Sequence, residues 1–470
     1  MSKAQFGMIG LGTMGRNFLL NVGEQGFVGL GYDHDVEKTK LLTDDARDLN
    51  ASAVATLPEF IAGLDLPRRI MMLVPAGPIV DSVIEELLPS LGYGDVIIDG
   101  GNSHFTDTER REAFLAEKGI SFLGVGVSGG EEGARHGASI MAGGNEAAYE
   151  QVRNIFEAAS AKVLGEPCAA HVGKSSAGHF VKMVHNGIEY AMMQLIAETY
   201  DYLRTKLALS SDEISKVFAA WNEGPLNSFL VEITAVVLAK KDSESGNPLA
   251  DMLLDTAGQK GTGKWTSQAA TDLGVPIPTI DSAVSMRQIS GRKVLRTQLA
   301  SQIKEDANPT REAAIELTIE DLAAALECAF LITYTQGMSL LQTASDEREY
   351  DLDLVEIAKI WRGGCIIRSR MLEDARAAFA DDAKLESLLL NARFAALVSA
   401  GEQALRSTVI AFTTQKIPSL CFASALNYLD AIRSERLPAN LIQAQRDHFG
   451  AHTYQRIDAD GFFHTPDWDK

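Results

Sequence analysis

Apolar and polar positions follow two different patterns along the chain, and the change falls near residue 175. The first 165 residues alternate short apolar or β-branched runs with amphipathic stretches, which is typical of a parallel sheet covered by helices. The runs expected as strands are FGMIG, FVGLGYD, RIMMLVP, DVIIDGG, FLGVGV and AKVLGE, and the stretches expected as helices include VEKTKLLTDDARDL and PIVDSVIEELLPSL. The pattern predicts an α/β domain at the N-terminus.

From about Ser175 onward, apolar residues recur at helical spacing, so the following part is expected to be nearly all helix. Examples are SSAGHFVKMVHNGIEYAMMQLIAETYDYL, NSFLVEITAVVLAK and IEDLAAALECAFLITYTQGMSLLQTA. The last thirty residues, 441–470, lose this periodicity and gain Gly, Pro, His and aromatic residues. We expect them to form an extended tail that docks on another surface.

Composition adds limits to this picture. A chain of 470 residues with 46% apolar residues is too long for one core and can build two or more. The four cysteines show neither disulfide nor metal-site spacing, no secretory signal begins the chain, and no apolar run approaches the roughly 18 residues that span a bilayer. A cytoplasmic protein is expected. The net charge of −20 disfavours nucleic acid and membrane surfaces, so an anionic ligand needs a locally basic pocket.

A glycine loop follows the first expected strand. It opens a helical pattern, RNFLLNVGEQG, and therefore has the context of a dinucleotide fingerprint, in which a helix N-terminus faces the pyrophosphate. The loop residues are Gly10, Leu11, Gly12, Thr13, Met14 and Gly15. They predict that residues 1–176 form a dinucleotide-binding, Rossmann-like domain, and the periodicity places an all-helical domain over 177–440 and the tail over 441–470.

Acidic residues end the second expected strand, at Asp33, His34 and Asp35. A carboxylate at this place hydrogen-bonds the hydroxyl groups of the adenosine ribose and repels a 2′-phosphate. The alternative is that these acids are solvated or cap the next helix.

The segment from Gly258 to Lys264, GQKGTGK, imitates a nucleotide-binding P-loop. Position 265 is Trp where a Ser or Thr should hold Mg²⁺, and no strand precedes the segment, so ATP hydrolysis is not expected. A basic, Gly-rich loop with free N–H groups suits a phosphate ester on a small substrate. The alternative is a surface turn with two solvated lysines.

The segment KMVHNGIEYAMMQL places its polar residues on one helical stripe. These residues are Lys182, His185, Asn186, Glu189 and Tyr190. The other faces are apolar, which predicts a buried helix whose stripe lines a cavity. Desolvation lowers the pKa of a lysine and raises that of a glutamate, so Lys182 is poised as a base and Glu189 as an acid. The alternative is a Lys–Glu pair inside a helix interface.

The chain has a full-length resemblance to the 6-phosphogluconate dehydrogenase family, decarboxylating enzymes of the pentose phosphate pathway, because it carries long motifs in the family's order. The motifs are GLGTMGRN, DGGNSHFTDTERR, VSGGEEGARHGASIMAGG, GHFVKMVHNGIEYAMMQLIAE, AGQKGTGKWT and LIQAQRDHFGAHTY. The resemblance implies that 177–440 is the substrate and dimerisation domain. It also implies oxidation of 6-phospho-D-gluconate to D-ribulose 5-phosphate and CO₂ with a nicotinamide dinucleotide. It implies no metal.

The resemblance also assigns roles to residues. Lys182 is the general base and Glu189 the general acid. The implied substrate contacts are Asn102, Ser128, Gly129, Gly130, His185, Asn186, Tyr190, Lys260, Thr262 and Arg287. Arg446 and His452 are implied to reach the active site of the neighbouring subunit in a homodimer. Together Lys182, Lys260, Arg287 and Arg446 supply the basic pocket that the net charge demands.

The cofactor residues depart from the family pattern at one place. NADP-using members carry Asn-Arg-Thr where this chain has Asp33, His34 and Asp35, and a basic residue common after the next core strand is replaced in the segment formed by Val74, Pro75 and Ala76. Asn102 is expected to contact the cofactor as well. Loss of an arginine–phosphate pair and gain of two carboxylates predict that NAD is preferred, although NADP is the family default.

Two other functions are compatible with parts of this pattern. A non-decarboxylating β-hydroxyacid dehydrogenase shares the glycine loop and a catalytic lysine, but it typically lacks the long helical half and the tail. A catalytically idle sensor of nucleotides or sugar phosphates would keep the pockets without needing Lys182 and Glu189. Release of CO₂ distinguishes the first alternative, and turnover distinguishes the second.

Overall fold

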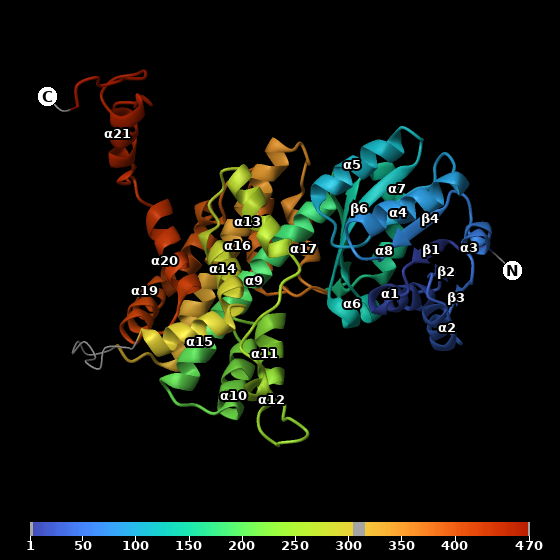
Figure 1. Ribbon diagram of the computed structural model, residues 1–470, viewed down its shortest axis with the longest axis horizontal. Helices are drawn as coiled ribbons and strands as arrows, with labels where there is room; N and C mark the ends of the chain where they lie inside the picture. The colour runs from blue at the N-terminus through green and yellow to red at the C-terminus, as the bar shows by residue number, and fades with distance from the viewer. Residues whose placement is uncertain (1–2, 304–314, 469–470) are drawn as a thin grey trace. The chain divides into compact units, whose positions relative to one another are not determined.

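A computed structural model describes residues 3–303 and 315–468. The chain divides into two compact units, residues 1–425 and 426–470, and each is described by itself. The first unit contains an α/β part followed by a large helical part (Figure 1). This is the fold class predicted from the hydrophobic pattern.

The α/β part is built on an eight-stranded sheet with the strand order β10-β7-β6-β5-β4-β1-β2-β3. The strands are β1 (Phe6–Ile9), β2 (Gly29–Tyr32), β3 (Ala51–Ala53), β4 (Arg69–Met72), β5 (Val96–Asp99), β6 (Ser121–Ser128), β7 (Ser139–Gly144) and β10 (Ala169–Gly173). The helices of this part are α1 (Thr13–Glu24), α2 (Val36–Asp45), α3 (Leu57–Gly63), α4 (Pro78–Leu87), α5 (Phe105–Ala116), α6 (Gly130–His136), α7 (Glu146–Glu150) and α8 (Arg153–Ala159). The six strands β1 to β6 are all parallel to one another, whereas β7 pairs antiparallel with β6, so the sheet is mixed.

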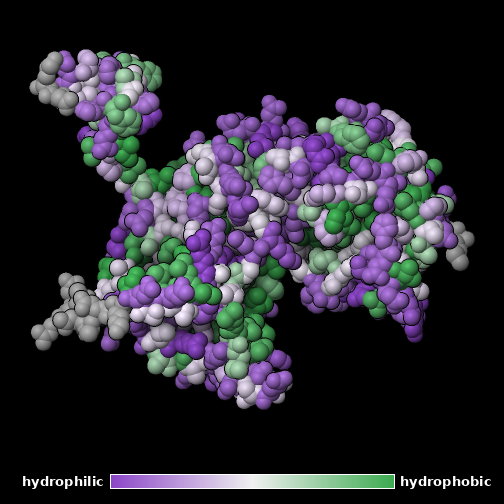
Figure 2. All heavy atoms as spheres, viewed as in Figure 1, coloured by the Kyte–Doolittle hydropathy of each residue, from purple (hydrophilic) through white to green (hydrophobic). Residues whose placement is uncertain are grey.

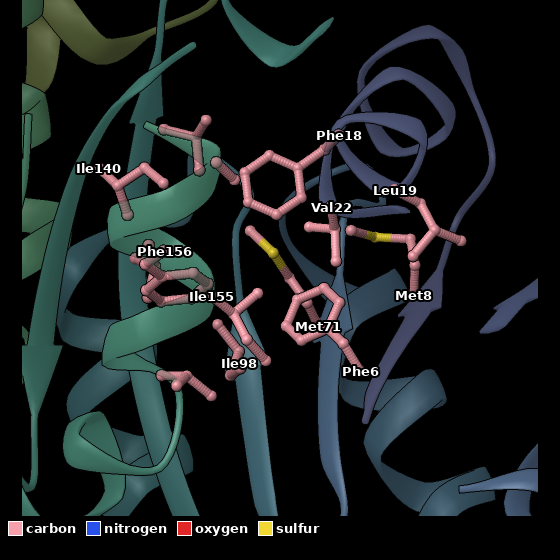
Figure 3. Close-up of a cluster of buried hydrophobic side chains, with 14 of the residues drawn as sticks. Phe6, Met8, Phe18, Leu19, Val22, Met71, Ile98, Ile140, Ile155 and Phe156 are labelled. Atoms are coloured by element: carbon pink, nitrogen blue, oxygen red, sulfur yellow. The ribbon is translucent and has the colours of Figure 1, made fainter. Parts of the chain in front are cut away.

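Both faces of the sheet are buried, because neighbouring residues of a strand point to opposite sides. Figure 3 shows one face, where Phe6 and Met71 pack against Phe18 of α1 and Phe156 of α8. The rings of Phe6, Phe18 and Phe156 lie 6.2–6.4 Å apart between centroids. Each such fully buried side chain stabilises the fold by about 1.5–3 kcal/mol. Because apolar clusters bury both faces of the sheet, the ends of its strands are held in fixed positions.

The helical part is organised around two helices of 29 residues each, α9 (Ala177–Thr205) and α16 (Ile319–Glu347). At 1.5 Å per residue each is about 44 Å long. Helix α9 packs against β6 and β7 at one side and against α13, α14 and α16 at others, so it joins the two parts. The remaining helices are α10 (Ser211–Asn222), α11 (Phe229–Ala239), α12 (Leu249–Met252), α13 (Thr262–Asp272), α14 (Pro278–Ser290), α15 (Lys293–Gln302), α17 (Leu354–Ile360), α18 (Met371–Asp381), α19 (Ala392–Thr414) and α20 (Leu420–Ile432).

One expected strand lies outside the sheet. The run AKVLGE was predicted as a strand of the parallel sheet, but it forms a small hairpin, in which β8 (Lys162–Val163) pairs antiparallel with β9 (Glu166–Pro167). The turn residues Leu164 and Gly165 have φ values of 52° and 82°. Two successive positive φ values reverse the chain tightly, which prevents the run from continuing as a sheet strand.

The second unit corrects the prediction of an extended tail. Residues 439–450 form helix α21 (Ala439–Gly450). Leu441, Ala444, Gln445, His448 and Phe449 recur at helical spacing and line one pocket with Trp468. Polar residues separate the apolar members of this stripe, so the helical periodicity of the segment is weak in the sequence. After α21 the chain makes an irregular hairpin in which Tyr454 pairs with Phe463.

Asp447 organises this hairpin from the end of α21. Its buried carboxylate accepts hydrogen bonds from the backbone N–H groups of Thr453 and Thr465, from His464 and from Trp468, at 2.9–3.0 Å. Desolvation of the carboxyl group opposes ionisation, but these donors bring the pKa of Asp447 to about 2. A single carboxylate therefore holds the residues after α21 together.

Candidate active site

The site begins at the edge of the sheet where the parallel strands end. Gly10 follows β1, Asp33 follows β2, Val74 lies after β4, Asn102 lies after β5 and Ser128 ends β6. These strands run parallel, so their carboxyl ends meet at the same edge. Ligands of open α/β sheets bind at this edge. Residues that are up to 118 positions apart thus belong to one region, a relation that strand order alone establishes.

The glycine loop provides a place for a pyrophosphate. Helix α1 begins after Gly12 without a side-chain cap, and nothing lies within 4 Å of the position where a Cβ of Gly12 would be. Gly10 has a φ of 91°, and a Cβ on Gly15 would overlap the carbonyl oxygen of Gly10. A helix N-terminus without a side-chain cap, next to open space at Gly12, suits an anion. The residues present therefore fit a bound dinucleotide.

The acidic residues after β2 have different roles in the structure. Asp33 accepts a hydrogen bond of 2.7 Å from the backbone N–H of Leu11, which places its carboxylate beside the glycine loop. Asp35 caps α2 by accepting from the N–H of Glu37, as the alternative interpretation of these acids proposed. Lys38 lies 3.6 Å from Asp33 and 4.0 Å from Asp35 and offsets one of the two negative charges.

His34 and the segment after β4 complete the edge of this pocket. The ring of His34 is exposed and lies 3.2 Å from the hydroxyl of Tyr32 and 3.3 Å from Glu86. Val74 is close to Gly10, where an added Cβ would come within 2.9 Å of it, whereas Pro75 and Ala76 are exposed. Neither residues 33–35 nor residues 74–76 include an arginine or a lysine. Lys38 follows the first segment, in the first turn of α2.

Helix α9 carries the predicted polar stripe and is buried as expected. Lys182 is 5% exposed and His185 is fully buried, whereas Asn186 and Glu189 are partly exposed. The backbone of α9 approaches β6 closely at Gly126, where any Cβ would overlap the Cβ of Lys182. The stripe is therefore not a solvated face, and Lys182 lies against the strand that ends at Ser128.

Burial perturbs the ionisable groups of the stripe in the directions that the sequence predicts. Burial lowers the pKa of Lys182, and the nearby Glu189 only partly opposes this effect. Burial raises the pKa of Glu189, while the charges of Lys182 and Arg287 oppose the rise. Burial and the neighbouring Lys182 hold the pKa of His185 well below its usual range. A lysine that loses its proton easily and a glutamate that keeps its proton suit a base and an acid.

A chain of hydrogen bonds links α13, α9 and β6. The side-chain amide of Asn186 donates to Thr262 Oγ1 at 3.1 Å, so its oxygen faces His185 Nδ1 at 2.9 Å. Nδ1 of His185 then carries the proton, and Nε2 accepts from the hydroxyl of Ser128 at 3.3 Å. Lys182 Nζ lies 3.5 Å from the same Nδ1. The chain brings four of the predicted substrate residues together.

The Gly-rich loop leads into α13. Thr262 is its first residue, and Gly261 precedes it with a φ of 103°. Lys260 is exposed, and Arg287 lies over the ring of Tyr190 at 4.2 Å and donates to the carbonyl of Gly258 at 2.8 Å. The bond to Gly258 holds Arg287 against this loop, and Lys260 stands two residues before the first residue of α13. Cationic residues beside a helix N-terminus favour an anion.

Four predicted residues remain to be located. Gly129 and Gly130 follow Ser128 at the start of α6 and have φ values of 106° and 62°. Arg446 lies on α21 and His452 just beyond it, in the second unit. Arg446 contacts Gln443 at 3.1 Å, and His452 packs on Phe449 with ring centroids 5.9 Å apart.

Family models match nearly all of the chain. The model of the NAD binding domain of 6-phosphogluconate dehydrogenase matches residues 5–173, and that of the 6-phosphogluconate dehydrogenase C-terminal domain matches residues 178–468. The chain belongs to the 6-phosphogluconate dehydrogenase family. The resemblance carried by the sequence motifs is thereby confirmed.

Members of the 6-phosphogluconate dehydrogenase family match over their full length. A Bacillus subtilis protein named 6-phosphogluconate dehydrogenase, NADP(+)-dependent, decarboxylating, is 48% identical, with 100% of both chains covered. A decarboxylating 6-phosphogluconate dehydrogenase of Saccharomyces cerevisiae is 46% identical, covering 96% of this chain and 93% of its own. The solved 6-phosphogluconate dehydrogenase of Plasmodium falciparum has a TM-score of 0.94 at 44% identity, covering 98% of this chain and 99% of its own.

The structure also adds neighbours that the sequence did not single out. The ring of Trp361 packs on His185 with centroids 5.7 Å apart. The Cys365 thiol is buried close enough to Lys182 for the two groups to affect each other's pKa, and burial raises the pKa of Cys365 to about 12. Both residues follow α17, about 180 positions from the stripe, so only the tertiary structure relates them to a 6-phosphogluconate dehydrogenase site.

Proposed function

We propose that this chain oxidises 6-phospho-D-gluconate with a nicotinamide dinucleotide and releases CO₂ to form D-ribulose 5-phosphate. The observation that carries the proposal is the pair of opposite pKa shifts on α9, a lysine with a lowered pKa and a glutamate with a raised pKa on one buried stripe. The B. subtilis relative is named as a decarboxylating enzyme and the P. falciparum relative has 6-phosphogluconate as its substrate, which supports the proposal. The division into residues 1–176, 177–440 and 441–470 is part of the proposal.

The chemistry assigns one proton-transfer role to each ionisable group. Neutral Lys182 accepts the proton of the C3 hydroxyl, and the bound nicotinamide supplies the hydride acceptor for C3. The product is a β-keto acid, which loses CO₂ as the Lys182 ammonium returns the proton to the ketone oxygen. Glu189 then donates a proton to the carbon that lost CO₂. Lys182 takes up the enol proton, so the lysine ends protonated and Glu189 ends ionised. Transfer of one proton from Lys182 to Glu189 restores both groups for the next cycle.

The other stripe residues bind the substrate in this proposal. Ser128, His185 and Asn186 form the hydrogen-bonded chain beside Lys182 and contact the sugar hydroxyl and carboxylate groups. The remaining assigned contacts come from Asn102, Gly129, Gly130, Tyr190, Lys260, Thr262 and Arg287. The N-terminus of α13 with Lys260 and Arg287 suits the phosphate group, because N–H groups and cations converge there.

Cofactor choice is a separate part of the proposal. The B. subtilis relative is named NADP(+)-dependent, and the P. falciparum structure was solved with NADP⁺. We infer that this chain prefers NAD, because Asp33 lies at the glycine loop and suits ribose hydroxyl groups, while His34, Asp35, Val74, Pro75 and Ala76 provide no fork for a 2′-phosphate. Lys38 lies 3.6 Å from Asp33 and 4.0 Å from Asp35, so the two carboxylates share its charge.

A triple variant tests this preference. Asp33→Asn, His34→Arg and Asp35→Thr together remove two negative charges and add a guanidinium. We expect the ratio of kcat/KM for NADP to that for NAD to rise about 100-fold, since a charge-assisted arginine pair contributes about 1.5–3 kcal/mol. Lys38→Gln is the matched control and should lower the use of NADP further. A wild-type enzyme that clearly prefers NADP would refute the inference.

The proposal includes a homodimer in which Arg446 and His452 complete the active site of the neighbouring subunit. Apolar side chains are exposed on helices α11, α12, α14 and α15 and on the two residues that follow α12, and Figure 2 shows hydrophobic surface over α11. They are Val236, Val237, Met252, Leu253, Leu254, Ile289, Val294, Leu295 and Leu299. An exposed apolar surface of this extent marks an interaction site. Mixing Lys182→Ala with Arg446→Ala tests the exchange, because only shared sites regain activity in the mixed dimer.

The compartment of the protein is inferred from its cysteines. None of the described helices is long and apolar enough to cross a membrane. The proposal places the enzyme in the cytoplasm, because its four cysteines follow no disulfide pattern and the described ones are buried and free.

A spectrophotometric assay tests the activity directly. With 6-phosphogluconate and either cofactor, the wild type should form reduced cofactor and CO₂ in equal amounts. Reduced cofactor without CO₂ would favour a non-decarboxylating β-hydroxyacid dehydrogenase. Binding of both ligands without turnover would favour the idle sensor.

A further inference from the structure

We propose that Arg111 is a positioning residue that holds the loop after β4, which carries Ala76, in place relative to the loop after β5, which carries Asn102. In the same proposal, His179 links these loops to α9, the helix that carries Lys182. The inference rests on the proposed function, because it concerns the placing of Ala76 and Asn102 relative to Lys182. Arg111 lies on α5, and its hydrogen bonds to the two loops go to Gly77 and Ser103, not to the exposed Ala76 and Asn102.

Arg111 is a cation with almost no access to water. Its side chain is 1% exposed, and a buried guanidinium is tolerated only when its donors are paired. Nε and Nη2 each donate to a carboxylate oxygen of Asp81 at 2.9 Å. Such a two-pronged pair fixes the plane of the guanidinium, and it lowers the pKa of Asp81 to about 2. The remaining donors are therefore aimed in fixed directions.

Those donors reach both loops. Nη2 donates to the carbonyl oxygen of Gly77 at 3.0 Å, next to Ala76 in the segment after β4. Nη1 donates to the hydroxyl of Ser103 at 3.3 Å and lies 3.5 Å from Asp99. One rigid group thus spans two segments whose strands, β4 and β5, are neighbours in the sheet.

Asp99 fixes the turn that presents Asn102. One of its carboxylate oxygens accepts from the hydroxyl of Ser103 at 2.6 Å and the other from the N–H of Gly101 at 3.0 Å. Asn102 lies between these two anchored residues and is exposed. Because both neighbours are held by one buried carboxylate, the position of Asn102 follows that of Asp99 and Arg111.

His179 connects this turn to α9, one turn before Lys182. Its Nε2 lies 3.1 Å from the backbone oxygen of Asp99, an acceptor, so Nε2 carries the proton. Its Nδ1 then accepts from the hydroxyl of Thr108 on α5, at 2.6 Å. His179 is 2% exposed, and burial lowers its pKa, which keeps the ring neutral. The imidazole ring of His179 therefore links α9 to α5 and to the turn that contains Asn102.

Replacing Arg111 tests the tie. Arg111→Lys keeps the charge but cannot span both loops, because an ammonium lacks the planar fork. We expect kcat/KM to fall about 10- to 100-fold, with a higher KM for the cofactor, as misplacement of reacting groups predicts. The deuterium isotope effect on kcat/KM with 3-deuterated 6-phosphogluconate should rise, because hydride transfer becomes slower. A merely structural role would lower the melting temperature and leave the isotope effect unchanged.

Arg110 provides the matched control. It precedes Arg111, is 56% exposed and also pairs with Asp81, at 2.9 Å, but contacts neither loop. Arg110→Lys should keep kcat/KM within about twofold of wild type, since exposed pairs contribute little. Ser103→Ala removes only the hydroxyl bridge and should lower kcat/KM roughly three- to tenfold, the range of one hydrogen bond.

The outcomes separate the two levels of inference. Wild type without turnover of 6-phosphogluconate refutes the proposed function. Active wild type with a folded Arg111→Lys variant of unchanged kcat/KM and isotope effect refutes the positioning role alone. If Arg111→Lys does not fold, Ser103→Ala decides, and wild-type values for that variant overturn the role.

Discussion

The buried carboxyl group of Glu198, on α9, contacts the start of α20, and its effect on the free energy of unfolding can be measured. Glu198 is 2% exposed and accepts hydrogen bonds from the backbone N–H groups of Cys421 and Phe422, at 3.0 and 3.1 Å. Gln194 donates to the same carboxyl group at 3.2 Å. Burial raises the pKa of Glu198 to about 7, although these donors oppose the rise.

The raised pKa makes the stability contribution of Glu198 depend on pH. Between the usual value of 4.5 and about 7, the folded protein keeps the proton that the unfolded chain releases. The free energy of unfolding therefore decreases as pH rises through this window and is constant above it. Each pH unit contributes about 1.4 kcal/mol, so the whole window corresponds to roughly 3 kcal/mol.

The variant Glu198→Gln removes the titration and keeps the shape. Its amide nitrogen cannot accept from Phe422, so we expect it to be about 1–3 kcal/mol less stable than wild type at pH 5, where Glu198 is protonated in the fold. By pH 8 the wild type should have lost this advantage, because its carboxyl group is then ionised at a cost. The difference between the two proteins therefore shrinks to zero or reverses.

Urea unfolding of both proteins at pH 5, 6, 7 and 8, at one protein concentration, measures this difference. Glu347→Gln, the same substitution at an exposed position at the end of α16, is the control and should keep the wild-type pH dependence. A constant difference between wild type and Glu198→Gln across the series would refute the reasoning. It would mean that the N–H donors compensate for burial completely.

The remaining predictions concern the catalytic stripe and the second unit. Lys182→Ala should lower kcat about 10²- to 10⁴-fold with a small change in substrate KM, and equal rates in a turnover assay would remove Lys182 from the mechanism. The wild-type kcat/KM should fall at low pH as Lys182 gains a proton and at high pH as Glu189 loses one; Glu189→Gln should abolish the alkaline limb of the pH profile, and its persistence would assign that limb elsewhere. Asn186→Leu interrupts the chain between Thr262 and His185, so substrate KM should rise about tenfold in steady-state assays, whereas cofactor KM should not. Asp447→Asn leaves N–H donors without a charged acceptor, and faster proteolysis after α21, followed by mass spectrometry, should report the loosened hairpin.

Patterns among neighbouring residues were sufficient to predict the longer helices and strands, the polar stripe on α9 and the glycine loop. The stripe on α9 could be predicted because helical periodicity places Lys182 and Glu189 on one face of a helix that is apolar elsewhere. The glycine loop could be predicted because a strand, three glycines and a helix follow one another directly. The helix α21 was missed because its stripe, from Leu441 to Phe449, alternates with polar residues.

What the sequence determined by itself is therefore everything that depends on near neighbours: the elements with strong periodicity, the family, and the opposite pKa shifts of Lys182 and Glu189. The tertiary structure decided what depends on packing between distant segments. The run AKVLGE became a hairpin because the turn at Leu164 and Gly165 reverses the chain, and Asp35 became a helix cap while Asp33 turned toward the glycine loop. Arg111 is an ordinary arginine in the sequence, and only strand order and burial bring it between two loops, because a side chain's partners depend on the fold and not on its neighbours along the chain.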